Sequence, residues 1–259
     1  MAGKLRGLHG WADTHTAGRC GRVGALRIKE RQYESRVDMT IELRSGLLLL
    51  RRLSERHLAW RVTVINTPGP PLIVYSDASY EPGSGKAPRL GWLIYDPLIG
   101  QKPVVAATLD VPLSVVSSWT PREQQIFAAE AFAPVSATYN HPSAFYGRDV
   151  LWFIDNEAAA ATLIRGASRE KDVCEIAECT HLLWAHLRCR VWVEWIDSDS
   201  NPSDGLSRDG IMDQWCLSRD IPIIVAAPPP WDSPTTLAED ILSSDYIHCV
   251  FSSHHLSSR

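Results

Sequence analysis

The sequence predicts an α/β fold with a mixed five-stranded sheet and helices on both of its faces. Three observations predict this class. Short apolar runs bounded by Gly, Pro and polar residues recur along the chain, as buried strands require. Longer segments with helical periodicity lie between the later runs. The resulting order is three strands, a helix, a strand, helices, a strand and a last short helix, which is typical of a mixed sheet.

Two segments precede the predicted sheet. Residues 1–36 begin with a stretch rich in Gly, Arg, His and Thr that has no sustained period, so we expect a disordered or remnant N-terminal arm. Residues 37–66 place apolar positions such as Leu48 and Leu53 at roughly helical spacing, with arginines between them. We expect a basic amphipathic helical connector there. It would either pack as a solvated helix on the following domain or contact nucleic acid.

The main domain is expected to span residues 67–220, after a Pro- and Gly-rich breaker at its start. Its strands are expected at residues 72–75, 90–95, 104–109, 150–154 and 191–196, and its helices at residues 121–138, 157–164, 170–187 and from Asn201 onward. Residues 221–259 are rich in Pro and then in Ser. They are expected to form a tail that lies on the surface or is disordered.

Composition and charge narrow the class of protein. No apolar run approaches the ~20 residues that span a bilayer, and the N-terminus lacks the apolar core of a secretory signal, so we expect a soluble intracellular protein or a fragment of one. The six cysteines show no CxxC spacing, and we expect them to be reduced rather than to bind zinc.

The charge is unevenly divided along the chain. Residues 1–63 contain 13 Lys and Arg against 6 Asp and Glu, whereas the remaining chain contains 13 against 24. An acidic body argues against a domain that binds nucleic acid by bulk charge. Such a body is suited to gathering metal cations.

Four carboxylates occupy defined points of the predicted elements. Asp77 ends the first strand and Asp155 the fourth, while Glu130 lies on the first long helix and Asp204 on the last. Three of them have ordinary explanations: a turn for Asp77, a helix cap for Asp155 and the helix dipole for Asp204. Glu130 has none, because its neighbours one helical turn away are apolar. A carboxylate on the face that meets the sheet needs compensation, which a metal ion would supply.

A second acid, Glu123, precedes Glu130 on the same predicted helix. With Thr120 as the N-cap and Pro121 as the first helical residue, Glu123 would close a capping box. This local role explains Glu123 without any site. Glu130 is therefore the candidate ligand.

Three stretches carry a resemblance to the ribonuclease H domain of retroelement reverse transcriptases, of the long-terminal-repeat and tyrosine-recombinase types. They are Tyr-Ser-Asp-Ala-Ser at residues 75–79, Phe-Ile-Asp-Asn-Glu-Ala at residues 153–158, and Asn-Pro-Ser-Asp-Gly-Leu-Ser-Arg at residues 201–208. The resemblance implies a ribonuclease H-like fold, in which three antiparallel strands precede two parallel ones. It places Asp77 and Asp155 side by side on neighbouring parallel strands.

The same resemblance implies chemistry with two metal ions. Asp77, Glu130, Asp155 and Asp204 would hold two Mg²⁺ or Mn²⁺ ions, which prefer hard oxygen ligands. Two such ions activate a water and stabilise the leaving oxygen of a phosphodiester. The implied activity is endonucleolytic hydrolysis of the RNA strand in an RNA–DNA hybrid. A reverse-transcriptase polymerase domain is an implied partner, and this sequence shows no polymerase signature of its own.

Three residues within the matching stretches, Ser79, Asn156 and Arg208, are expected to contact nucleic acid. The sequence departs from many ribonucleases H because residues 197–200, before the last acid, read Asp-Ser-Asp-Ser where a histidine is common. This departure affects the expected rate of catalysis more than the resemblance to the family.

Three alternative interpretations of the function stay open. One alternative is a non-catalytic module, decayed or structural, that binds nucleic acid or a partner. A second is a 3′–5′ exonuclease of the same superfold, although such enzymes carry an acid where Ser79 stands. A third is a transposase or integrase, which would end its acidic triad with Glu where this chain has Asp204.

Overall fold

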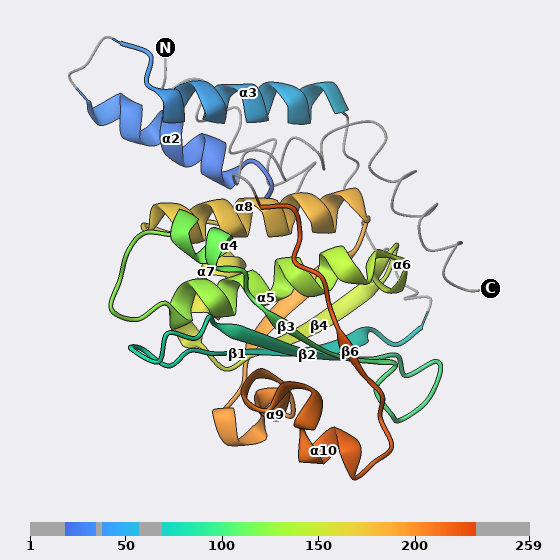
Figure 1. Cartoon of the computed structure of the whole chain (residues 1–259). Coiled ribbons are helices and arrows are strands. Elements are labelled where there is room, and N and C mark those ends of the chain that lie inside the picture. Colours follow the sequence, from blue (N-terminus) through green and yellow to red (C-terminus); the bar gives the residue numbers. More distant parts are fainter. Residues whose placement is uncertain (1–18, 35–37, 57–68, 232–259) are drawn as a thin grey trace.

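The structure is a computed structural model of the 259-residue chain, and it describes residues 19–34, 38–56 and 69–231. Six strands form one mixed sheet in the order β5-β4-β1-β2-β3-β6 (Figure 1). The strands are β1 (Leu72–Ser79), β2 (Arg89–Tyr95), β3 (Val105–Asp110), β4 (Asp149–Ile154), β5 (Arg190–Trp195) and β6 (Ile223–Val225). β1, β2 and β3 are antiparallel neighbours, whereas β4 pairs in parallel with both β1 and β5. The predicted α/β class and mixed sheet are confirmed, and the predicted pairing pattern holds for the first five strands.

The central strand pair fixes the position of two of the predicted site residues. In the parallel pair of β1 and β4, Ser76 lies opposite Ile154. Asp77 and Asp155 are the next residues along the two segments, so they come side by side. This is the arrangement expected of parallel neighbours. Asp155 directly follows β4, whereas Asp77 does not end its strand as predicted, because β1 continues to Ser79 through its pairing with β2.

Helices cover both faces of the sheet, as predicted (Figure 1). On one face lie α5 (Ile126–Asn140), α7 (Glu157–Arg165) and α8 (Lys171–His186), with the short α4 (Leu113–Ser118) and α6 (Pro142–Phe145); on the other lie α9 (Asp204–Arg208) and α10 (Gln214–Leu217). Two 3₁₀ turns, Ser198–Ser200 and Gly210–Met212, flank α9. Helix α5 packs between the sheet and α8, and residues 128–138 are buried without exception, which explains its almost wholly apolar sequence. No helix in the described part of the chain is both long and apolar enough to cross a bilayer.

Part of the expected N-terminal arm is helical, which corrects that prediction. Residues 22–33 form α2 (Arg22–Tyr33), whose Val23 and Ile28 are buried. It pairs with α3 (Ile41–Arg56), the helical part of the expected connector. The two helices approach closely at a pair of glycines, since a Cβ on Gly24 would lie 2.9 Å from the Gly46 oxygen. The rest of the expected arm and connector, residues 1–18, 35–37 and 57–66, lies outside the described residues.

The hairpin of α2 and α3 packs on the outer side of α8 (Figure 1). The guanidinium of Arg27 lies 3.9 Å from carboxylate oxygens of both Glu175 and Glu178 on α8, and it also donates to the Ser45 hydroxyl at 3.1 Å. Leu53 of α3 is buried in the main core. The helical connector therefore packs on the domain, and its expected contact with nucleic acid stays a prediction.

The sheet continues past residue 220, where the sequence predicted that the domain would end. Strand β6 pairs in parallel with β3 and raises the number of strands from the predicted five to six. The following segment crosses α5 (Figure 1), and Trp231 packs edge-to-face on Phe132, with ring centroids 5.0 Å apart. The Pro-rich segment also contains apolar residues, and these form β6 and the contact of Trp231 with α5. Residues 232–259 of the expected tail lie outside the described residues.

Helix α5 begins at Ile126 rather than at Pro121, so the predicted capping box is wrong. The backbone N–H of Thr120 donates to the Asp172 carboxylate of α8 at 3.1 Å, and Glu123 is exposed in the loop before the helix. A tertiary hydrogen bond replaces the local cap here. Glu123 is thereby separated from the site that Glu130 joins.

Candidate active site

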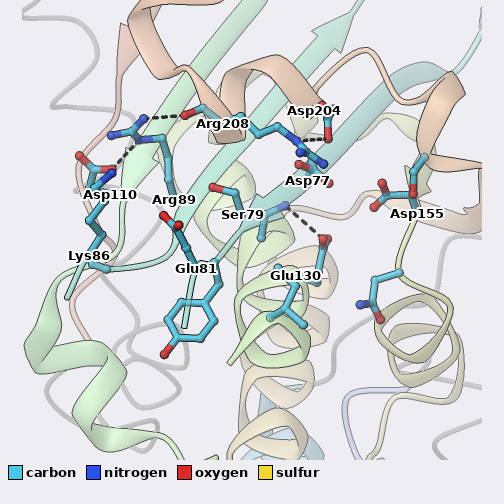
Figure 2. A pocket seen from close by; sticks show the side chains of 16 residues that line it. Asp77, Ser79, Glu81, Lys86, Arg89, Asp110, Glu130, Asp155, Asp204 and Arg208 are labelled. Atoms are coloured by element: carbon cyan, nitrogen blue, oxygen red, sulfur yellow. Dashed lines mark hydrogen bonds and ion pairs between the residues drawn. The ribbon is translucent and has the colours of Figure 1, made fainter. Parts of the chain in front are cut away.

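Three of the four predicted acids converge in one cluster. Asp77, Glu130 and Asp155 each offer a carboxylate oxygen, and these oxygens all lie within 4.8 Å of one another. Asp77 comes from β1, Asp155 from the turn after β4, and Glu130 from α5 in the helical layer on one face of the sheet (Figure 2). In the described part of the chain, the Cys and His residues of α8 form no comparable group.

Glu130 lies at the buried end of the cluster, with 3% of its surface exposed. Its Oε1 accepts a hydrogen bond from the backbone N–H of Ala78 at 3.2 Å (Figure 2). Its Oε2 is buried, and no donor in the described residues reaches it. Burial, and then the charges of Asp77 and Asp155, raise the pKa of Glu130 well above its ordinary value. A buried carboxylate beside two further carboxylates is either neutralised by a proton or compensated by a bound cation.

Asp77 is buried at 4% exposure between Glu130 and the helix on the opposite face. Its carboxylate accepts a hydrogen bond from the Ser207 hydroxyl of α9. Burial first, and then the charges of Asp155 and Asp204, raise its pKa to about 7, although the Ser207 hydrogen bond acts in the opposite direction. Like-charged carboxylates in one buried space raise one another's pKa unless a cation is bound.

Asp155 is half-buried at the mouth of the cluster, and it is not a helix cap. The cap of α7 is Asn156, whose side-chain oxygen accepts from the backbone N–H of Ala159 at 3.0 Å. The backbone oxygen of Asp155 accepts from the indole N–H of Trp195 at 2.9 Å. The carboxylate of Asp155 is therefore free to join the cluster. Asn156 caps the helix and also lines the cleft, and its expected contact with nucleic acid stays a prediction.

The fourth acid, Asp204, lines the same cleft but lies outside the cluster of three. Its carboxylate accepts a hydrogen bond from Nε of Arg208, one helical turn later, at 2.7 Å. Asp204 is the first residue of α9, not the third, because the helix does not begin at Asn201. The Asn201 side chain instead donates to the Ser76 oxygen of β1 at 3.2 Å and accepts from Ser203.

Helix α9 docks against the sheet through contacts that the sequence analysis did not identify. Gly91 of β2 lies opposite Asp77, and a Cβ there would lie 2.6 Å from the Ser207 backbone nitrogen. The Ser79 hydroxyl donates to the Ser207 backbone oxygen at 2.6 Å, so Ser79 joins β1 to α9 besides lining the cleft. A glycine inside an otherwise apolar strand was the available signal, since it marks close approach of another backbone.

The acids open onto a cleft with a volume of about 900 Å³. Three cationic side chains line it, those of Lys86, Arg89 and Arg208. The sequence analysis did not identify Lys86 and Arg89, which lie in the β1–β2 turn and at the start of β2, outside the stretches that carry the family resemblance. Arg89 donates to Asp110 at 2.6 Å and to the Arg208 backbone oxygen at 3.1 Å (Figure 2). The cations alternate with two further acids of the lining, Glu81 and Asp110, so only part of their charge is uncompensated in the cleft.

Comparisons with known proteins give a likeness of fold to a solved structure. No protein-family model matches the chain, and no curated protein is similar to it. Among solved structures, the chain is similar to the N-terminal ribonuclease H domain of Rv2228c from Mycobacterium tuberculosis, solved as a fusion with maltose-binding protein. The identity is 13% and the TM-score 0.43, over 57% of this chain and 97% of that one. This likeness concerns the fold and not the activity.

Proposed function

We propose that this protein is a metal-dependent endonuclease that hydrolyses the RNA strand of RNA–DNA hybrids, using two Mg²⁺ or Mn²⁺ ions. The observation that carries the proposal is the carboxylate of Glu130, whose Oε2 is buried without a donor and which lies within 4.8 Å of carboxylate oxygens of Asp77 and Asp155. An uncompensated carboxylate of this kind fits a divalent cation with oxygen ligands. The retroelement origin rests on the three sequence stretches that carry the family resemblance.

In this proposal Asp77, Glu130 and Asp155 hold the ions, and Asp204 completes the set. When bound, the ions supply an activated water and stabilise the charge on the leaving oxygen. The raised pKa values mean that Asp77 and Glu130 release protons as the ions bind, since metal ligands must be deprotonated. The buried positions of both side chains keep their oxygens in a fixed geometry.

The cations of the cleft have a second part in the proposal. Lys86 and Arg89 flank the acids on the side of β2, where they would bind phosphates next to the scissile one. Discrimination of RNA from DNA needs contacts to the 2′-hydroxyl, which donates and accepts hydrogen bonds. Asn156 and Ser198 are polar side chains that line the cleft and could make such contacts.

The test is cleavage of labelled substrates in the presence of Mg²⁺, Mn²⁺ or EDTA. We expect cleavage of the RNA strand of an RNA–DNA hybrid with either metal, and none with EDTA. Double-stranded RNA and single-stranded DNA should stay intact. Glu130→Gln should reduce cleavage by orders of magnitude while circular dichroism shows a folded protein. Glu123→Gln is the matched control, because Glu123 is exposed in the loop before α5, and its activity should equal that of the parent.

Three results would replace the proposal. A hybrid that binds but is not cut with any divalent metal would indicate the non-catalytic module. Stepwise shortening of DNA from its 3′ end would indicate the exonuclease. Inactive Glu123→Gln together with active Glu130→Gln would show that the cluster is not the catalytic site.

A further inference from the structure

The fourth acid of the site stands apart from the other three, and a cation holds it there. Asp204 lines the cleft, yet its carboxylate is not among the oxygens that lie within 4.8 Å of one another. It is paired with Arg208, whose side chain Figure 2 shows ending between Asp204 and Asp77. The pair thus occupies the side of the cluster from which a fourth ligand would come.

The Asp204–Arg208 pair is exposed enough to be exchanged for another partner. The side chain of Arg208 is 68% exposed and that of Asp204 37% exposed, and the two residues are one helical turn apart. Ion pairs of this type contribute little net free energy, because water solvates both charges well. A phosphate is a stronger partner for a guanidinium, since it accepts two parallel charge-assisted hydrogen bonds.

The backbone that carries the pair is fixed, so only the side chains can rearrange. The backbone oxygen of Arg208 accepts from Arg89, and the backbone oxygen of Ser207 accepts from Ser79. Gly91 lets this helix lie directly against β2. With the α9 backbone anchored at these points, rotation of the Asp204 side chain is the available route toward the cluster.

We propose that Arg208 is a positioning residue that keeps Asp204 away from the metal site until a phosphate of the nucleic acid takes its guanidinium. Arg208 then binds the strand, and Asp204 turns to the cluster and completes the ligand set. The inference rests on the proposed function and adds a sequence of binding events, in which binding of the substrate strand completes the metal site. Metal binding and strand binding are therefore coupled, and each strengthens the other.

The first test measures metal binding without nucleic acid. Arg208→Gln should release Asp204, so the Mn²⁺ concentration that gives half of the maximal rise in melting temperature should fall about two- to fivefold, the factor that an exposed ion pair is worth. In the Asp204→Asn background, the same Arg208→Gln change should leave the Mn²⁺ dependence unaltered. This double-mutant cycle isolates the pair from other effects of the substitution.

The second test measures strand binding by fluorescence anisotropy with a labelled RNA–DNA hybrid, in the Glu130→Gln background so that no cleavage occurs. Arg208→Gln should weaken hybrid binding about tenfold, because a charge-assisted phosphate contact is lost. Tighter metal binding together with weaker strand binding is the pattern expected of a residue that serves both partners in turn.

A matched control exists on α3, where Arg51 donates from Nε to Glu55 at 2.8 Å with the same spacing of four residues and similar exposure. Arg51→Gln should leave the Mn²⁺ titration unchanged. Because α3 belongs to the connector whose contact with nucleic acid stays a prediction, the control for hybrid binding is Arg165→Gln, an exposed arginine in the last turn of α7 that does not line the cleft. Arg165→Gln should leave hybrid binding unchanged. Equal loss of hybrid affinity in Arg208→Gln and Arg165→Gln would show that bulk charge alone acts, and weaker Mn²⁺ binding in Arg208→Gln would show that Arg208 supports the metal site directly. Either result overturns the inference. If the parent protein binds neither Mn²⁺ nor hybrid, the proposed function itself fails.

Discussion

At the scale of single residues, Gly91 decides how close the last helix comes to the acids. A methyl group at this position would lie 2.6 Å from the Ser207 backbone nitrogen and 2.7 Å from Cβ of Leu206. Both atoms belong to α9, which is held to the sheet by hydrogen bonds from Ser79 and Arg89. Any added side chain therefore pushes α9 away from β2, and Asp204 moves with it.

Gly91→Ala should consequently destabilise the protein by about 1–3 kcal/mol, the usual range for overpacking a close contact. It should also reduce the rise in melting temperature caused by Mn²⁺, because Asp204 and Ser207 no longer lie where the cluster needs them. Urea denaturation and a thermal titration with Mn²⁺ measure the two effects. Gly100→Ala is the control, since a Cβ there meets nothing within 4 Å; equal stability of both variants would contradict this account of α9.

At the scale of elements, the position of Glu130 depends on how α5 is held from three sides. The sheet lies below the helix and α8 above it, and the segment after β6 crosses the side that these two layers leave uncovered (Figure 1). Asn140 near the end of α5 bonds to the backbone of Ala227 in both directions, at 2.9 Å and 3.3 Å. Trp231 then packs against Phe132, two residues after the catalytic candidate. The segment after β6 is thus a strap that fixes α5.

Removal of the strap's anchor should be costly. Trp231 is 5% exposed, so Trp231→Ala should lower the free energy of unfolding by about 3–5 kcal/mol, as for other buried aromatic residues. Trp192→Ala provides the comparison, because Trp192 is 66% exposed on β5 and its loss should change stability by less than about 0.5 kcal/mol. Chemical denaturation of both variants gives the result. A small loss for Trp231→Ala would mean that the strap does not hold α5.

At the scale of the whole molecule, the acidic cluster links stability to pH and metal. The folded-state pKa of Asp77 is raised from its ordinary 3.8 to about 7, and that of Glu130 is raised as well. Between these pH values the folded protein binds more protons than the unfolded chain. The stability contributed by the protonated acids is therefore complete below pH 4 and is lost as the pH rises through 7. Glu178, buried under Arg27 with a pKa of about 7, adds to the same trend.

We therefore expect the metal-free protein to melt at a lower temperature at pH 8 than at pH 5. Millimolar Mn²⁺ should reverse most of this loss at pH 8 and do little at pH 5, where protons compete for the ligands. Asp77→Asn should flatten the metal-free profile and remove most of the Mn²⁺ effect. Glu178→Gln should flatten the profile in part and leave the Mn²⁺ effect unchanged, because Glu178 lies on α8 outside the cluster. A melting temperature that does not respond to Mn²⁺ at pH 8 would exclude the proposed site.

The sequence by itself determined the order of the first five strands and of the main helices between them, and it singled out the three acids that meet in the cluster. Asp77 and Asp155 each follow an apolar run that predicts a strand. Glu130 lies among apolar residues of a predicted helix. These are local properties, since the period of a strand or helix and the end of an apolar run can be read from neighbouring residues. Parallel pairing of β1 and β4 then brings the two aspartates together without further information.

Only the tertiary structure decided the rest. The docking of α9 against β2, the start of α5 at Ile126 and the sixth strand all depend on contacts between segments far apart in the chain. Asp172 binds the loop before α5 from another helix, and β3 recruits β6 across more than a hundred residues. The predictions of a capping box and of a disordered tail failed at these points, because both consider only neighbouring residues. A backbone group that binds a buried partner from a distant segment is stabilised more than one that binds a neighbouring side chain or solvent.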